Sequence, residues 1–312
     1  MGDYLNDINK LFPKRRTLKE KEGFREWAIK EANSLGYEAK VDAIGKHNNV
    51  VIGDIKTAKA VFTAHYDTPA MSLFPNIMIP RNIVMFFAYQ FLGPILMVIA
   101  ALWLAYLPLD YLSKNINIEP RSILMFTFII IYYLMFIVFY KLFKNPNNIN
   151  DNTSGVSAIY KLLSLINEEN KDKVAFVLFD NEEKGKLGSK ALFKREPNTF
   201  TNKIVVNMDC VANGNNIITI AKDEAMKLPE YKKLIASFNN TSEFNTYHYP
   251  LKGSESNSDY KSFPCGVGIM ACKKAKLVGF YTPRIHTIFD TVADSKNIDY
   301  IAFNLNQFVI NL

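Results

Sequence analysis

Two long stretches without charged residues constrain the fold of this chain more than any other feature. Residues 83–109 read IVMFFAYQFLGPILMVIAALWLAYLPL, and residues 122–140 read SILMFTFIIIYYLMFIVFY. A helix needs about 20 apolar residues to cross a bilayer, and both stretches have roughly that length. Because the segment between them is short, the sequence predicts a transmembrane hairpin of two helices at residues 81–145, with spans at about 83–109 and 121–143.

A pair of buried core helices is the alternative interpretation of these stretches. Core helices seldom remain free of charge over such a length, which favours the membrane. Aromatic residues close to the expected interfaces, such as Trp103 and Tyr140, are typical of membrane helices. The two spans therefore predict a membrane protein with two transmembrane helices.

The orientation of the hairpin is predicted from what flanks it. Arg81, Lys141 and Lys144 lie beyond its outer ends, while Lys114 and Arg121 lie in or beside the short loop, so the charge bias is slight. The residues before the first span contain no apolar run that could act as a signal peptide. We therefore expect the parts on both sides of the hairpin to be cytoplasmic.

The charge and cysteine content exclude some other classes. The net charge is +7, and several basic residues lie early in the chain, where Glu20, Glu22 and Glu26 alternate with them. This mixture is typical of a solvated helix face, and no nucleic-acid-binding motif is present. The early basic residues are Lys10, Lys14, Arg15, Arg16, Lys19 and Lys21. The three cysteines form no CxxC pair, which fits a reducing compartment and not a disulfide framework.

Outside the hairpin, short apolar runs alternate with helical patterns. Leu18, Phe24, Trp27, Ala28 and Ala32 predict one face of an amphipathic helix over residues 17–35. Strand-like runs occur at residues 49–55, 60–67, 174–180, 204–209 and 266–272, and further helical patterns at 156–169 and 226–238. This order predicts an α/β fold with a mostly parallel or mixed central sheet flanked by helices. Residues 1–80 and 146–312 are then two parts of one such domain.

Polar residues gather where the predicted strands end. His65 and Asp67 follow one strand, Glu182 and Glu183 follow another, and Asp209 follows a third. In sheets of this kind, ligand sites form at the carboxyl ends of the strands. Zinc binds histidine nitrogen and carboxylate oxygen, and two zinc ions need about three protein ligands each. Further candidates lie in two short motifs, DNTSG at residues 151–155 and IHTIFDT at residues 285–291.

Each motif alone is weak, since a single histidine is commonly structural and an aspartate before a helix is commonly an N-cap. Together, and in this order, they resemble the M28 family of co-catalytic zinc peptidases, which includes bacterial aminopeptidases and glutamate carboxypeptidases. The resemblance covers nearly the whole chain apart from the hairpin. The matching motifs are A-H-x-D-(S/T) at 64–68, D-(N/D)-x-(S/A)-G at 151–155, F-D-x-E-E-x-G-x-x-G-S at 179–189, the strand-end aspartate at 209, S-D-(H/Y)-x-x-F at 258–263 and H-(T/S)-x-x-D at 286–290.

The resemblance implies a two-zinc site and assigns its ligands. His65 and Asp209 hold one zinc ion, Glu183 and His286 hold the other, and Asp151 bridges the two. Co²⁺ and Mn²⁺ are the other metals such a site accepts. The residues alone do not decide which of the two adjacent glutamates is a ligand.

The resemblance also assigns the catalytic groups around the metals. It makes Glu182 the general base, and it implies that Asp67 and Asp290 orient His65 and His286, as metal-bound imidazoles require.

The chain departs from the family pattern in two places. Where some relatives have an oxyanion-stabilising tyrosine, this chain has Ile285, so Tyr281 and Arg284 are the nearby candidates for that role. The hairpin replaces a short loop between His65 and Asp151. From Tyr140 to Asp151 the chain spans at most about 40 Å, so we expect the active site to lie near the bilayer.

The leading expectation is a membrane-anchored zinc exopeptidase, an aminopeptidase, that acts on hydrophobic or membrane-associated peptides. Two alternatives remain. A glutaminyl-cyclase-like transferase works with one zinc and tends to lose the ligands of the first metal, whereas this chain keeps His65 and Asp209. A non-catalytic scaffold or receptor would have lost ligands, and none is missing. Nucleic acid is not an expected partner.

Overall fold

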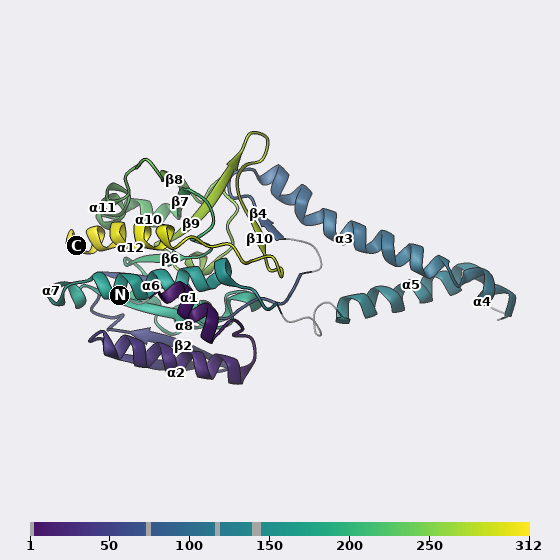
Figure 1. Ribbon diagram of the computed structural model, residues 1–312, viewed down its shortest axis with the longest axis horizontal. Coiled ribbons are helices and arrows are strands. Elements are labelled where there is room, and N and C mark those ends of the chain that lie inside the picture. The colour runs from purple at the N-terminus through teal and green to yellow at the C-terminus, as the bar shows by residue number, and fades with distance from the viewer. Residues whose placement is uncertain (1–2, 73–75, 116–118, 139–144) are drawn as a thin grey trace.

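A mixed sheet forms the centre of the molecule, and its middle strands are mostly apolar and buried along their whole length. The computed structural model describes residues 3–72, 76–115, 119–138 and 145–312 (Figure 1). The strand order is β1-β2-β5-β3-β6-β9-β10-β4, and β7 pairs with both β9 and β8. The strands are β1 Ala39–Ile44, β2 His47–Ile52, β3 Ala60–His65, β4 Asn76–Met78, β5 Val174–Phe179, β6 Ile204–Met208, β7 Asn216–Ala221, β8 Asn245–Pro250, β9 Gly266–Ala275 and β10 Gly279–Ile285.

The parallel centre of the sheet brings three strand ends to one edge. β3 pairs in parallel with β5 and β6, and β6 pairs in parallel with β9, whereas the outer pairs β1–β2, β2–β5, β9–β10 and β10–β4 are antiparallel. His65 lies opposite Phe179, so the residues that follow β3 and β5 meet at the same edge. The predicted fold class, a mostly parallel or mixed sheet flanked by helices, is confirmed.

Helices cover both faces of the sheet. One core packs α1, α2, α6 and α12 against it, and a second, smaller core under α8 and α9 contains Phe179, Leu192, Phe200 and Phe263. The helices of the domain are α1 Tyr4–Leu11, α2 Leu18–Ser34, α6 Ser154–Leu165, α7 Glu168–Lys171, α8 Leu187–Arg195, α9 Pro197–Phe200, α10 Asp223–Lys227, α11 Pro229–Ser237 and α12 Ser295–Ile310.

The helix predicted at residues 17–35 forms as α2. Its sequence explains where it begins and which of its residues are buried. Thr17 caps the first turn in a reciprocal capping box with Glu20. Phe24 is fully buried on the expected face, but Leu18 is 78% exposed, so its assignment to that face was wrong. Ala28 and Ala32 are buried with Phe24.

Two of the early basic residues are buried, and for these the predicted solvated face was wrong. Arg15 is fully buried, and Lys21 is 3% exposed. Each has polar partners far away in sequence, since Arg15 donates to Thr153 and Lys21 to Asp180. Buried cations are stable only when they are paired in this way, and a local charge pattern does not show such partners.

A helical hairpin projects from one end of the domain (Figure 1). It consists of α3 Ile83–Tyr106, α4 Leu109–Asn115 and α5 Pro120–Ile137, and the end of the second predicted span, residues 139–143, lies outside the described residues. α3 packs on α5, and its buried residues are the small Gly93, Ala101 and Ala105. Small residues let membrane helices approach closely.

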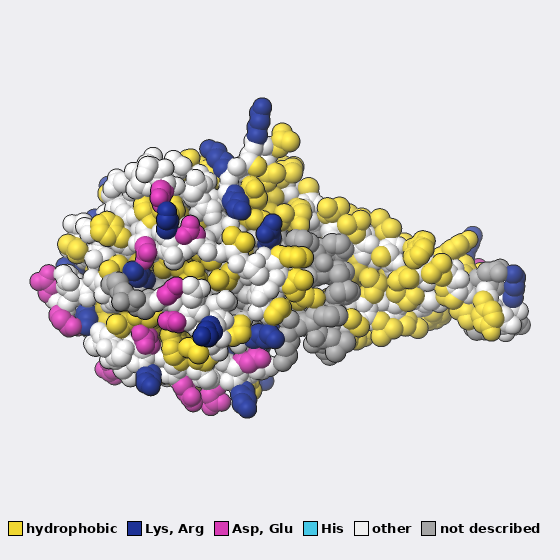
Figure 2. Space-filling view, viewed as in Figure 1, with side chains coloured by type: hydrophobic (Ala, Val, Ile, Leu, Met, Phe, Trp, Pro, Cys, Tyr) yellow, Lys and Arg dark blue, Asp and Glu magenta, His cyan; other side chains and the backbone are white. Residues whose placement is uncertain are grey.

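The hairpin helices are apolar and largely uncovered. Two described segments, Ile83–Asn115 (α3 with α4) and Pro120–Ile137 (α5), are long and apolar enough to cross a membrane, and few of their residues are buried. Figure 2 shows hydrophobic side chains along the visible face of the hairpin, whereas charged side chains are spread over the domain. Helices of a soluble core would be covered by other parts of the protein.

Candidate active site

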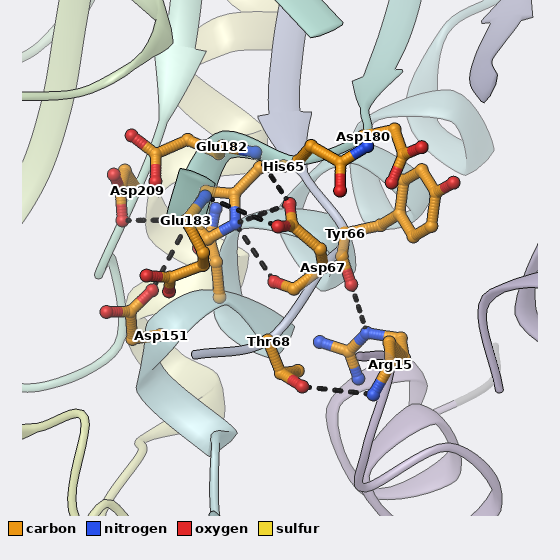
Figure 3. Close-up of polar contacts among 12 residues, drawn as sticks. Arg15, His65, Tyr66, Asp67, Thr68, Asp151, Asp180, Glu182, Glu183 and Asp209 are labelled. Atoms are coloured by element: carbon orange, nitrogen blue, oxygen red, sulfur yellow. Dashed lines mark hydrogen bonds and ion pairs between the residues drawn. The ribbon is translucent and has the colours of Figure 1, made fainter. Parts of the chain in front are cut away.

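The strand-end residues meet at one edge of the sheet, as the spacing of the motifs predicts (Figure 3). His65 ends β3, Asp209 follows β6, and Asp151 lies just before α6. His65 Nε2 is 3.3 Å from Asp151 Oδ1 and 3.7 Å from Asp209 Oδ1. These three buried side chains form a group whose ligand atoms lie within 4.8 Å of one another.

A second group of three shares Asp151 with the first. His286, which follows β10, places its Nε2 3.0 Å from Asp151 Oδ2 and 3.4 Å from Glu183 Oε2. The ligand atoms of Asp151, Glu183 and His286 also lie within 4.8 Å of one another. Asp151 thus directs one carboxylate oxygen to each histidine, which is the arrangement a bridging ligand needs.

Asp67 connects the first histidine to the two glutamates. Its carboxylate accepts hydrogen bonds from the backbone N–H of Glu182 (2.9 Å) and of Glu183 (3.3 Å). Its backbone oxygen lies 3.1 Å from His65 Nδ1. Asp67 therefore fixes both the turn after β5 and the ring of His65.

The resemblance implies that Asp290 orients the ring of His286, but its carboxylate contacts a different group. Its two carboxylate oxygens accept from the backbone N–H of Asn150 (3.1 Å) and of Asp151 (2.9 Å). Its hydrogen bonds therefore hold the backbone at Asp151 and do not reach the ring of His286. Burial raises the pKa of Asp290 to about 7, and the two backbone donors oppose that shift.

Two buried cations lie behind the acidic residues. Arg15 donates to the backbone oxygen of Tyr66 and to Thr153 Oγ1, and its backbone N–H donates to Thr68 (Figure 3). Burial lowers the pKa of Arg15 to about 10, while Asp67 and Asp151 favour its charged form. Lys21 Nζ is 2.6 Å from Asp180 Oδ1, in the residue directly after β5.

The electrostatics of the site follow from its concentration of carboxylates. Burial opposes protonation of His286, but Glu183 and Asp151 outweigh it and raise the pKa of His286 to about 9. Burial raises the pKa of Glu183 to about 8, although His286 opposes the shift. Burial also opposes protonation of His65, and Asp151, Asp209 and Asp67 raise its pKa well above the usual value. The metal-free site therefore holds protons that a cation could replace.

Glu182 differs from Glu183 in its contacts. Burial raises the pKa of Glu182 well above its usual value; the charge of His65 opposes the shift, and the carboxylates of Asp259 and Glu183 add to it. Its carboxylate belongs to neither group that contains Asp151, although Glu182 lies close to His65 and Glu183. Glu182 instead forms a third group with His65 and Glu183, whose ligand atoms also lie within 4.8 Å of one another, so only Glu183 shares a group with Asp151.

The residues present fit a metal site. Glu183 Oε1 and Asp209 Oδ1 are buried and make no hydrogen bond with the described residues. A buried carboxylate oxygen without a partner costs free energy, and a cation in either group would supply the missing interaction. Imidazole nitrogen and carboxylate oxygen are both zinc ligands.

These side chains line a cavity of about 420 Å³ that also contains residues the sequence did not single out. Its charged lining is acidic, because Glu255 adds a carboxylate and none of the described lining residues is Lys or Arg. Two residues of α3, Phe86 and Gln90, contribute to its wall. Glu255 lies three residues before the start of the motif at 258–263, and Gln90 is the one amide side chain in the apolar stretch 83–109, so both had a signal in the sequence.

The suggested oxyanion-stabilising residues do not line this cavity. Tyr281 lines a separate apolar cavity beside α3, and Arg284 is exposed. Ile285, at the position where some relatives have tyrosine, does line the cavity with the metal-ligand candidates.

Comparison with known families decides the assignment that these motifs suggest. The family model for Peptidase family M28 matches residues 141–309, which is more than half of the chain. The chain belongs to peptidase family M28. The match begins at the end of the second predicted span, and it includes the motifs that carry Asp151, Glu182, Glu183, Asp209 and His286.

Solved structures share the fold of this M28 chain. A Zn-dependent exopeptidase from Parabacteroides distasonis has a TM-score of 0.57 at 11% identity, over 99% of this chain and 96% of that one. The LapA aminopeptidase of Legionella pneumophila has a TM-score of 0.55 at 13% identity, over 98% and 69%. Porphyromonas gingivalis glutaminyl cyclase has a TM-score of 0.55 at 12% identity, over 99% and 96%. At these identities the similarity shows the fold alone. No curated protein matches the chain.

Proposed function

We propose that this M28 protein is a zinc-dependent aminopeptidase held in a membrane by its helical hairpin. The observation that carries the proposal is the placement of Asp151, whose two oxygens face His65 and His286 at 3.3 and 3.0 Å. One carboxylate between two histidine-containing groups suits a pair of metal ions that share a ligand. His65 and Asp209 would hold one zinc ion, and Glu183 and His286 the other.

Zinc bound in such a site supplies Lewis acidity and a water of lowered pKa. The chain supplies the proton transfers. Glu182 shares a group with His65 and Glu183 but belongs to neither group that contains Asp151, and we assign its carboxylate the transfer of a proton from the attacking water to the leaving amine. Asp67 fixes the backbone of Glu182 through the 2.9 Å hydrogen bond, which keeps the base in place.

The charge of the cavity favours an aminopeptidase over a carboxypeptidase. A carboxypeptidase needs a cation for the terminal carboxylate of its substrate, and no described lining residue is Lys or Arg. An aminopeptidase needs an anion for the terminal ammonium group. Glu255 lines the cavity outside both metal-ligand groups and is the carboxylate available for that contact.

A glutaminyl-cyclase-like transferase is the second candidate, because P. gingivalis glutaminyl cyclase shares the fold over almost the whole length of both chains. In that reaction the amine of an N-terminal glutamine attacks its own side-chain amide and releases ammonia. The presence of two three-residue groups that share Asp151 favours the peptidase, since one of them would be sufficient for a single zinc.

The hairpin supports a location at the membrane and substrates that are hydrophobic or membrane-associated. Its helices are uncovered and apolar, and α3 begins at the wall of the cavity. A cavity built partly from the start of a membrane helix lies close to the bilayer surface. The remainder of the domain is proposed to face the cytoplasm.

Digestion of a defined peptide mixture, read by mass spectrometry, tests this function. The zinc-loaded protein should remove single residues from free amino termini, and the metal-free protein should leave the mixture intact. Loss of carboxyl-terminal residues would contradict the aminopeptidase assignment. Loss of ammonia from peptides that begin with glutamine, without cleavage, would establish the cyclase instead.

A further inference from the structure

Residues at the start of the first hairpin helix face the site that the proposed function requires. Phe86 and Gln90 are four residues apart on α3, so they project from the same helix face, and both line the cavity that contains His65 and His286. Asn76 and Met78 of β4 line the same cavity and are two residues apart, on one face of the strand. The neighbouring faces of α3 and β4 instead line an apolar cavity of about 440 Å³.

Gln90 is unusual within its helix. It is the one amide side chain in residues 83–109, and a polar side chain in a membrane helix is costly enough to indicate a functional role. Gln90 Nε2 donates to Asn76 Oδ1 at 3.1 Å. Gln90 Oε1 and Asn76 Nδ2 make no hydrogen bond with the described residues, so one acceptor and one donor remain available. That combination matches the C=O and N–H of a peptide group.

The amide pair lies where two cavities meet. Besides the cavity with the metal-ligand candidates and the apolar cavity, a third cavity of about 270 Å³ is lined by Asn76 and Gln90 together with residues of α3 as far as Gly93 and Pro94. Asn76 and Gln90 line both this cavity and the one with the metal-ligand candidates. A peptide that extends away from the metal site in this direction passes the amide pair and continues along the membrane helix.

The wall beside the metal-ligand candidates offers apolar contacts. Phe86, Met78 and the buried Ile285 line the cavity together with its acidic side chains. Such a surface favours an apolar side chain in the residue next to the bond that is cut.

We propose that the start of α3 forms part of the substrate site: Gln90 and Asn76 bind the peptide backbone, and Phe86 contacts the substrate's apolar side chain. The proposal rests on the proposed aminopeptidase function and narrows its substrates to peptides of three or more residues with an apolar residue at the cleaved bond. The membrane helix is then a determinant of specificity as well as an anchor.

Steady-state kinetics of Gln90→Leu in full-length, zinc-loaded protein test the backbone contact. The substrates are a leucine anilide, which ends at the first residue, and a tetrapeptide that begins with leucine. Loss of a hydrogen-bond partner costs about tenfold in affinity. The variant should therefore raise KM for the tetrapeptide by about tenfold. This factor should be at least about five times the factor by which KM for the anilide rises. The matched control is Phe91→Leu, at a 61% exposed neighbouring position outside the cavity, which should leave both reactions unchanged.

Phe86→Ala tests the side-chain contact in the same assay. It should change the ratio of kcat/KM between anilides of phenylalanine and alanine by about fivefold or more, as expected for a packing contact of about 1 kcal/mol. Equal effects of Gln90→Leu on both substrates, or an unchanged ratio in Phe86→Ala, would overturn the inference. Wild-type protein that hydrolyses neither substrate would overturn the proposed function itself, so the two failures are distinguishable.

The backbone contact can also be measured without turnover. In the Glu182→Gln background, the Kd of the tetrapeptide should increase about tenfold when Gln90→Leu is added. An unchanged Kd would contradict the contact even if the activity of the double variant cannot be read.

Discussion

Asp151 and the residues around it determine how the site responds to protons. Zinc binds histidine and carboxylate ligands only in their deprotonated forms. In the metal-free chain the pKa of His286 is raised to about 9 and that of Glu183 to about 8, so at neutral pH zinc must displace protons from both. Affinity for zinc should therefore fall as pH falls through this range.

Zinc competition assays between pH 6 and pH 9 measure this dependence. Each displaced proton gives a slope of tenfold per pH unit, so the affinity should change at least ~10-fold per unit below pH 8. Proton release on zinc binding, read by calorimetry in buffers of different ionisation enthalpy, provides a second measurement. An affinity that stays constant from pH 6 to pH 8 would show that these side chains are not the ligands.

At the residue scale, the sequence predicted the positions that follow strands and missed those that depend on distant partners. His65, Glu182 and Asp209 were placed correctly at one edge because parallel strands end together. The burial of Arg15 was not predictable, because its partner Thr153 is 138 residues away. The contact of Asp290 with Asp151 is set by how a loop folds back, which a motif does not show.

At the scale of elements, the ion pair between α2 and the turn after β5 joins the helix to the segment that carries Glu182 and Glu183. Lys21 Nζ contacts both Asp180 and Asn181, and both charged side chains are 4% exposed. Removing one partner of a buried pair leaves an uncompensated charge and typically costs about 3–5 kcal/mol. Lys21→Met should thus lower the free energy of unfolding by about that amount and reduce peptidase activity.

Thermal unfolding in detergent compares this variant with Lys19→Met, an exposed position on the same helix. The control should unfold at the wild-type temperature, since surface substitutions rarely change stability by more than about 0.5 kcal/mol. Equal unfolding temperatures for the two variants would show that the ion pair contributes little.

Most strands that are buried along their whole length were predictable, but β7 was missed although all six of its residues are buried. The fully buried runs that form β3, β5 and β6 were identified, because continuous apolar strands are typical of a sheet covered on both faces. β8 and β10 were missed, since their patterns are interrupted by polar residues and by Pro250 and Pro283. These strands form through pairing with neighbours, and a local pattern does not reveal that pairing.

At the scale of the whole molecule, the hairpin is proposed to hold the protein at a membrane. Two uncovered apolar helices predict that the full-length chain stays in the membrane pellet after salt and alkaline carbonate washes and enters solution only with detergent. Recovery in the carbonate supernatant would contradict membrane insertion.

Deletion of residues 80–145 tests the effect of the hairpin on substrate choice. The deleted protein should cleave hydrophobic peptides held in liposomes at least ~10-fold more slowly than the full-length chain, because it loses its local concentration at the bilayer. Cleavage of a water-soluble peptide by the same preparation shows whether the domain still folds. Unchanged cleavage in liposomes would remove the proposed link between anchor and substrate.

Glu182→Gln tests the central claim most directly, because it removes the proposed base while the five ligand candidates His65, Asp151, Glu183, Asp209 and His286 remain. The measurement is the rate of peptide hydrolysis at a zinc content matched to wild type. General-base catalysis typically contributes 10²–10⁴-fold, so the rate should fall at least ~100-fold while zinc content stays near normal. Hydrolysis at the wild-type rate would contradict the mechanism.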